Sequence, residues 1–262
     1  MSEVLGWRVA TANIASGRDR RTFRPALEHW LADAADLDVD LLALQEVDHL
    51  LERSGRVDQT AAIAEAVRGD GPAWDARFAP TVHGTPGRRT TMRPADGTTP
   101  HEPGYGIALL SRHPVEDWRE LRMAPARLTV PVPDEQRVAL AGVVRTPRGP
   151  ATAVTTHLSF VPTRALAQLR GLVAWAEDLP RPLVLLGDLN LPAPVVNRVT
   201  GWQSAVRAAT FPAPRPALQL DHVLLDADDT RPDGLSVRAG VAREVGRSDH
   251  RALRAELVID GR

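Results

Sequence analysis

The stretch Leu183-Val184-Leu185-Leu186-Gly187-Asp188-Leu189-Asn190 has the pattern of a buried strand that ends in a carboxylate and a carboxamide. An apolar run of this length, bounded by prolines, is typical of a short core strand. Alternate residues of an extended chain project to the same side, so Asp188 and Asn190 can face one cleft while Leu189 packs inward. An acid and an amide placed together suit hydrated metal or phosphate chemistry. Both residue types are also common in turns, so this interpretation depends on partners elsewhere in the chain.

The composition sets the class of protein and the kinds of metal site that are possible. The chain has 262 residues, a net charge of -1 and 43% hydrophobic residues. These values are ordinary for a soluble globular protein, and they allow residues 1–262 to form a single α/β domain. The chain has no cysteine, which excludes disulfides and thiolate ligands. A bound metal would therefore be held by oxygen or imidazole, which favours Mg²⁺, Mn²⁺ or Ca²⁺.

The first residues and the charge balance bear on location and partners. Residues 1–7 lack a basic segment followed by an apolar one, and no apolar run approaches the roughly 18–20 residues that span a bilayer. We therefore expect a cytoplasmic protein with no membrane segment. The near-neutral charge argues against non-specific coating of nucleic acid, although it leaves room for a local basic groove.

Strand-like and helix-like patterns alternate along the chain. Helices are expected after the candidate caps Thr22, Asp58 and Thr163, a long loop over 82–104, and no clear element over 191–220. Strands are expected over 7–13, 40–45, 107–110, 137–145, 151–156, 183–188, 221–225 and 251–259. Strands joined sometimes by helices and sometimes by hairpins predict a mixed sheet system covered by helices.

Several polar residues stand where the predicted strands begin or end. Taken singly, each has an ordinary structural interpretation: a solvated glutamate, a half-buried histidine or a turn former. Their conjunction indicates a site, because ligands gather at strand ends in α/β proteins. The residues are Asn13, Glu46, His157, Asp188, Asn190, Asp221, Asp249 and His250.

From Asn13 to His250 these residues resemble, in order, the endonuclease/exonuclease/phosphatase superfamily. The most specific motifs are Gly187-Asp188-Leu189-Asn190 and Ser248-Asp249-His250. Support comes from Gln45-Glu46, Thr156-His157-Leu158, Leu220-Asp221-His222 and the strand-like Tyr105 to Arg112. The resemblance implies a DNase I-like four-layer α/β/β/α sandwich, with two mixed β-sheets face to face and helices outside.

Hydrolysis of a phosphate ester requires charge neutralisation at the phosphoryl oxygens, a positioned water and a stabilised leaving oxygen. Glu46 and Asp249 are hard oxygen donors of the kind that Mg²⁺ binds. The resemblance implies that these positions surround the metal together with Asn13. We therefore expect Glu46 as the main ligand, with Asn13 and Asp249 contributing directly or through water. The expected cofactor is Mg²⁺, with Mn²⁺ as the alternative.

The resemblance also implies roles in proton handling. His250 would act on the attacking water or contact the scissile phosphate, with Asp221 rather than Asp249 as its carboxylate partner. A carboxylate beside an imidazole fixes the tautomer and stabilises the charged form. Asp188 would orient or deprotonate the nucleophile, or approach the metal, and both roles stay open.

Two further positions complete the expected centre. Asn190 would donate an amide hydrogen bond to the phosphate, and His157 would be a second imidazole on the phosphate or leaving-group side. A histidine at that position differs from some abasic-site nucleases. Ala15 stands where certain nucleases place an extra acid, which weakens the case for a second metal. His222 is expected to be structural.

Three functions fit the sequence. We favour a Mg²⁺-dependent phosphoesterase, acting on phosphodiesters as a monomer, and hydrolysing them by attack of water on phosphorus. The alternative is a DNA or RNA endonuclease or exonuclease, for which a basic groove could use Arg88, Arg89 and Arg93. Arg164 and Arg170 could also reach a phosphate, although solvated helix arginines are the simpler expectation. A non-catalytic binding module on the same fold is the third and least favoured function.

Overall fold

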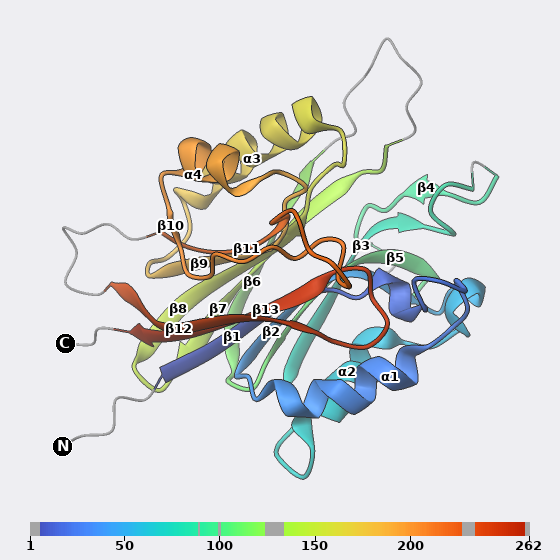
Figure 1. Cartoon of the computed structure of the whole chain (residues 1–262), viewed down its shortest axis with the longest axis horizontal. Helices are drawn as coiled ribbons and strands as arrows, with labels where there is room; N and C mark the ends of the chain where they lie inside the picture. Colours follow the sequence, from blue (N-terminus) through green and yellow to red (C-terminus); the bar gives the residue numbers. More distant parts are fainter. Residues whose placement is uncertain (1–5, 89, 99–100, 124–133, 227–233, 260–262) are drawn as a thin grey trace.

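Two β-sheets lie face to face in the computed structural model, which describes residues 6–88, 90–98, 101–123, 134–226 and 234–259 (Figure 1). The first sheet is seven-stranded. Its strands, in spatial order, are β12 (Leu235–Glu244), β13 (Arg251–Ile259), β1 (Gly6–Asn13), β2 (Leu41–His49), β5 (Gly104–Ser111), β3 (Asp75–His83) and β4 (Arg93–Pro94).

The second sheet is six-stranded and comes from one continuous stretch of chain. Its spatial order is β10 (Gln203–Ser204), β11 (Asp221–Asp226), β9 (Leu183–Asp188), β8 (Gly149–His157), β7 (Arg137–Thr146) and β6 (Val115–Met123). Each sheet is mixed, because β1–β2 and β8–β9 pair in parallel while the other described pairs are antiparallel. The chain leaves the first sheet after β5 and returns to it only with β12 and β13.

The strand β9 is apolar from Leu183 to Leu186 because both of its faces are buried. Val184 and Leu186 point into the core between the two sheets, whereas Leu183 and Leu185 point to the helix side of the second sheet. Both faces are covered, so every position of the run is buried. Burial of each such side chain stabilises the fold by about 1.5–3 kcal/mol.

Helices cover the outer face of each sheet (Figure 1). On the first sheet lie α1 (Leu27–Ala34) and α2 (Gln59–Arg68), which pack Trp30 and Ile63 against it. On the second sheet lie α3 (Pro162–Ala176) and α4 (Ala193–Thr200), and the buried side chains of α3 include Leu169. The predicted four-layer α/β sandwich of two mixed sheets with outer helices is therefore confirmed.

The helix starts agree only in part with the predicted caps. The carboxylate of Asp58 accepts a hydrogen bond from the backbone N–H of Ala61 at 3.0 Å, so this cap is confirmed. Thr22 was the wrong cap for α1, which begins at Leu27. The reason is local: Asp19 Oδ1 accepts from the backbone and hydroxyl of Thr22, which holds the preceding segment in a turn.

Thr163 was also a wrong cap, because α3 begins one residue earlier at Pro162. A proline is favoured in the first turn, where its missing N–H costs nothing. The side chain of Ser159 instead accepts from the backbone N–H of Val161 at 3.0 Å, just ahead of the helix.

The predicted loop over 82–104 was wrong at several points. Val82 and His83 end β3, and they pair with Arg93 and Pro94 of β4. The segment 191–220, which had no clear pattern, contains α4 and β10. Among the described residues, no helix has the length and apolar character needed to cross a membrane. The assignment of residues 1–262 to one domain stays a prediction.

Candidate active site

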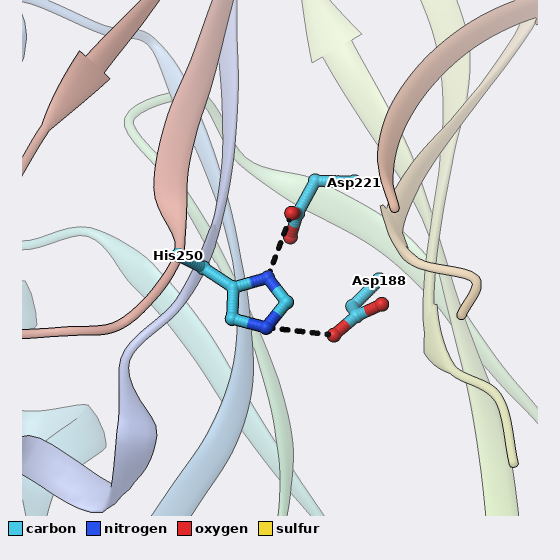
Figure 2. A group of neighbouring side chains, drawn as sticks. All are labelled: Asp188, Asp221 and His250. Atoms are coloured by element: carbon cyan, nitrogen blue, oxygen red, sulfur yellow. Dashed lines mark hydrogen bonds and ion pairs between the residues drawn. The ribbon is translucent and has the colours of Figure 1, made fainter. Parts of the chain in front are cut away.

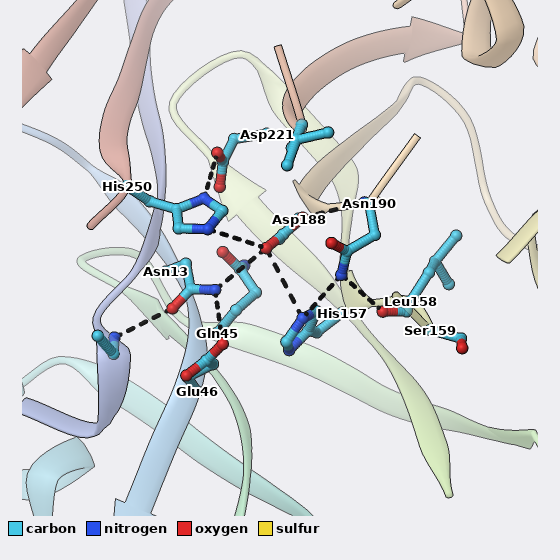
Figure 3. A network of polar contacts seen from close by, with 12 residues as sticks. Asn13, Gln45, Glu46, His157, Leu158, Ser159, Asp188, Asn190, Asp221 and His250 are labelled. Carbon is cyan, nitrogen blue, oxygen red and sulfur yellow. Dashed lines mark hydrogen bonds and ion pairs between the residues drawn. The ribbon is translucent and has the colours of Figure 1, made fainter. Parts of the chain in front are cut away.

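Strand ends of both sheets converge on a group of polar side chains (Figure 3). In the second sheet the register aligns three neighbouring strands, with His157 opposite Asp188 and Asp188 opposite Asp221. In the first sheet Asn13 lies opposite Gln45, next to Glu46. The register of the two sheets therefore brings most of the predicted residues together without any long loop.

Asp188 lies at the centre of the group. Its Oδ2 accepts from Asn13 Nδ2 at 3.1 Å, and its Oδ1 accepts from the backbone N–H of Asn190 at 3.0 Å. The Nε2 atoms of His157 and His250 lie 3.7 Å and 3.8 Å from Oδ2. Burial, together with the negative charge of Asp221, raises the pKa of the Asp188 carboxyl well above its ordinary value. A carboxylate of this kind is suited to hold or accept a proton near neutral pH.

His250 forms a close pair with Asp221, and its other nitrogen faces Asp188 (Figure 2). Its Nδ1 lies 2.8 Å from Asp221 Oδ2, so we assign the Nδ1 proton to this hydrogen bond. Burial opposes a charged imidazole, but the hydrogen bond to Asp221 and the charges of Asp221, Asp188 and Asp249 outweigh it and raise the pKa of His250 to about 10. The ring of Phe211 packs against the imidazole with a centroid distance of 4.9 Å. His250 is therefore held as a cation with its Nε2–H toward Asp188.

His157 and Asn190 form the opposite side of the group. Asn190 Nδ2 lies 3.1 Å from His157 Nε2 and donates to the carbonyl of Leu158 at 3.0 Å. Because an amide nitrogen only donates, His157 Nε2 acts as the acceptor and the ring is neutral. Burial and the positive charges of Arg137 and His250 lower the pKa of His157 well below its ordinary value. The Asn190 amide, expected on the phosphate, thus also fixes the ring of His157.

Glu46 enters the site from an irregularity in β2. The pairing of β2 with β5 shifts register between Leu44 and Val47, and Glu46 has a φ of 54°. Such a bulge turns a side chain away from the regular alternation of the strand. Glu46 Oε1 accepts from Asn13 Nδ2 at 3.1 Å, the same nitrogen that donates to Asp188. Asn13 is thereby the link between the Glu46 side and the Asp188 side.

Two sets of residues could hold a metal ion. Ligand atoms of Asp188, Asp221 and His250 lie within 4.8 Å of one another. However, His250 Nδ1 is already bonded to Asp221, and a protonated imidazole is not a metal ligand. The oxygen donors Glu46 and Asn13 fit Mg²⁺ better, since Glu46 is half-buried and Asn13 Oδ1, which accepts from Ala15 N–H at 3.0 Å, keeps a second lone pair. Asp249 is half-buried beside His250, and within the described part of the chain no hydrogen bond joins its side chain to Glu46 or Asn13.

For several other residues the structure differs from the sequence prediction or adds a contact that was not predicted. Arg164, expected to be solvated, is only 5% exposed and lies 2.8 Å from Asp134. Asp134 is far from Arg164 in sequence, so nothing local signalled the pair. Phe211 lies in the stretch that had no clear pattern. His222 donates from Nε2 to the carbonyl of Leu191 at 2.9 Å, which agrees with the structural role expected for it.

The two-sheet α/β sandwich gathers carboxylates, carboxamides and imidazoles at its strand ends. The chain belongs to the endonuclease/exonuclease/phosphatase family, whose model matches residues 10–250. No curated protein sequence gives a significant match. The predicted membership is therefore confirmed by the family model.

Solved structures with this fold come from several organisms. An endonuclease/exonuclease/phosphatase from Beutenbergia cavernae is 23% identical with a TM-score of 0.70, covering 98% of this chain and 72% of that one. A mannosyl-6-phosphatase from Bacteroides thetaiotaomicron is 14% identical with a TM-score of 0.64, covering 97% of this chain and 100% of that one. The human Nocturnin catalytic domain with bound sulfate is 19% identical with a TM-score of 0.65, covering 97% and 93%. At these identities the similarity shows the fold alone.

Proposed function

We propose that this protein is a Mg²⁺-dependent phosphoesterase that hydrolyses phosphodiesters by attack of water on phosphorus. The observation that carries the proposal is the placement of a cationic His250 and a high-pKa Asp188 against each other, 3.8 Å apart, beside Glu46 and Asn13. Mg²⁺ held by Glu46, with Asn13 and Asp249 contributing directly or through water, would neutralise charge on the phosphoryl oxygens.

The protonation states support one division of work between Asp188 and His250. An imidazole with a pKa of about 10 is protonated at neutral pH and does not take a proton from water. We therefore assign His250 to charge stabilisation at the phosphate, where its Nε2–H can donate. Asp188, whose pKa is raised, is the better acceptor for the proton of the attacking water. Asp221 keeps His250 charged and correctly turned.

Asn190 is assigned to the phosphate, and His157 to the phosphate or leaving-group side. The neutral ring of His157 is oriented by the Asn190 amide, 3.1 Å away, which in turn is anchored on the carbonyl of Leu158. A substrate oxygen that displaces Asn190 from His157 would receive the amide hydrogen bond in its place.

The nuclease alternative depends on a basic surface. Arg93, one of the residues expected to line it, pairs with Glu102 at 2.6 Å, which lowers the charge available to a nucleic acid backbone. Arg89 lies outside the described residues. The phosphodiesterase assignment is thus favoured over a nuclease, and the intact set of acids and imidazoles disfavours a non-catalytic module. A monomeric state and a cytoplasmic location stay predictions from the sequence.

The test is a panel of substrates given to the purified protein with Mg²⁺, Mn²⁺ or EDTA. The panel contains a chromogenic phosphodiester, a chromogenic phosphomonoester, plasmid DNA and single-stranded RNA. We expect metal-dependent turnover of the diester that is lost in Glu46→Ala and His250→Ala and retained in His29→Ala, an exposed histidine on α1. No turnover of any phosphate ester with either metal would refute the proposal, and preferential cleavage of plasmid or RNA would favour the nuclease alternative.

A further inference from the structure

Three hydrogen-bonding side chains cross the apolar interface between the two sheets directly beneath the site. Thr11 on β1 donates from Oγ1 to Gln45 Oε1 on β2 at 3.1 Å. Gln45 Nε2 then donates to Thr155 Oγ1 on β8, in the other sheet, at 3.1 Å. All three residues are fully buried, and their surroundings are the aliphatic residues of the core between the sheets. We call these three residues the Gln45 bridge.

Each residue of the Gln45 bridge lies one or two positions before a residue of the candidate site. Thr11 is two residues before Asn13 on the same face of β1, and Thr155 is two residues before His157 on the same face of β8. Gln45 immediately precedes Glu46, and Figure 3 shows it close to both Glu46 and Asn13. The bridge thus joins the side of the site that carries Glu46 to the side that carries His157.

Gln45 also holds the site through its backbone. Its carbonyl accepts from the N–H of Ile14 at 3.0 Å, just after Asn13. Gln45 pairs with Asn13 of β1, but Gln45 and Glu46 occupy the interval in which the β2–β5 pairing loses register, so the β5 side of the ladder does not fix them. The side-chain amide supplies the missing anchor.

The physical reason for a polar bridge in an apolar layer is directionality. Contacts between aliphatic side chains are non-directional, so they tolerate small sliding of one sheet over the other. A buried amide must keep its hydrogen bonds, because a buried polar group without a partner is costly. The Gln45 bridge therefore admits one relative placement of β2 and β8.

We propose that Gln45, with Thr155, is a positioning residue that sets the spacing between the Glu46 side and the His157 side of the site. This inference rests on the proposed phosphoesterase function, in which a phosphate must contact both sides at once. A misplacement of about 1 Å between reacting groups can lower turnover by about a hundredfold. Loss of the bridge should therefore act on kcat more than on KM.

The experiment compares variants that differ by a single hydroxyl. Thr155→Val keeps the shape and removes the partner of Gln45, whereas Thr155→Ser keeps the hydroxyl. The matched control is Thr152→Val on the same strand, because Thr152 is equally buried but donates to the carbonyl of Pro180 at 2.6 Å, away from the site. Gln45→Met removes the bridge from its centre, and the double variant with Thr155→Val measures coupling.

We expect Thr155→Val and Gln45→Met to lower kcat by about tenfold to a hundredfold with KM changed by less than about threefold. Thr155→Ser should recover kcat to within about threefold of the unmodified protein. The double variant should have the same kcat as Gln45→Met alone, because Gln45→Met already removes the hydrogen bond to Thr155. Thr152→Val should lower Tm by a similar amount and leave kcat unchanged. Equal kcat losses in Thr155→Val and Thr152→Val, or no loss in either, would overturn the positioning role.

A second readout separates this inference from the proposed function. The ring Hε1 resonance of His157 in NMR spectra should shift in Thr155→Val and stay in place in Thr152→Val, whether or not any phosphate ester is hydrolysed. If the unmodified protein shows no turnover but Thr155→Val still shifts the His157 resonance, the phosphoesterase function is refuted and the structural role of the Gln45 bridge is supported. If the protein is active but Thr155→Val changes neither the His157 resonance nor kcat, the proposed function stands and the positioning role of the Gln45 bridge is refuted.

Discussion

Asp221 Oδ2 lies 2.8 Å from His250 Nδ1, and this buried pair links the start of β13 in the first sheet to the start of β11 in the second. The pair makes stability depend on pH. The imidazole, with an ordinary pKa near 6.5, keeps its proton in the folded protein up to about pH 10. The unfolded chain therefore releases this proton at lower pH than the folded one, and the pair's contribution is lost as pH rises through that interval.

We predict that Asp221→Asn removes most of the decrease in unfolding free energy between about pH 7 and 10, and brings the His250 pKa down toward its ordinary value. Urea denaturation at several pH values measures the first effect, and NMR titration of the His250 ring measures the second. Asp226→Asn, at the far end of the same strand, is the control. An unchanged His250 titration in Asp221→Asn would contradict the assignment of this pair.

The proposed metal set gives a prediction that does not require a substrate. Glu46→Gln should weaken Mg²⁺ binding by about a hundredfold or more, because loss of outer partners alone costs about 10–100-fold in metal sites. Mg²⁺ should raise the Tm of the unmodified protein and of Glu65→Gln, an exposed glutamate on α2, but not that of Glu46→Gln. Calorimetric titration gives the affinities. Equal Mg²⁺ affinity in Glu46→Gln and the unmodified protein would exclude Glu46 as a ligand.

Asn190 combines the side-chain amide proposed to contact the phosphate with an unusual backbone conformation. Its φ of 50° is in the left-handed region, which asparagine and glycine tolerate better than alanine. Asn190→Ala should therefore lower the unfolding free energy by about 1 kcal/mol more than Asn190→Gly. Both variants should lose turnover to a similar extent, because both lack the amide that holds His157. Denaturation curves and kinetics on the same samples separate the two effects, and the reverse order of stability would show that the backbone is not under strain.

His157 should stay neutral across the physiological range. Burial and the nearby charges of Arg137 and His250 lower its pKa well below the ordinary value, so its ring resonances should not titrate within that range. The exposed ring of His29 serves as an internal reference in the same spectra. A midpoint for His157 inside this range would mean that it accepts a proton and does not act as the neutral partner of Asn190.

The sequence predicted those parts of the molecule that depend on local pattern. The run from Leu183 to Asp188 is buried on both faces, so its apolar character is continuous and easily recognised. The positions of the candidate site residues relative to the strands were predictable for a similar reason, because each stands beside a strand end within a short motif; their roles stay predictions. The Asp58 cap could also be predicted, since its hydrogen bond spans only three residues.

The parts that could not be predicted depend on contacts between distant segments. The edge strands β6 and β12 are largely half-buried or exposed along their length, so they show neither an apolar run nor a clean alternation. The burial of Arg164 requires Asp134, which the fold brings to it. The contact of Phe211 with His250, and the amide of Gln45 between two sheets, likewise follow only from the packing of the sheets.

The position of β13 between β1 and β12 has a consequence for synthesis on the ribosome. While the chain is being translated, β1 can pair with β2 early, but its other edge stays open until Arg251–Ile259 has emerged. His250, which directly precedes β13, arrives at Asp221 and Asp188 only at that moment. Nascent chains thus carry the Glu46 side and the Asp188 side long before they carry the histidine between them, so the centre is assembled in a single late event.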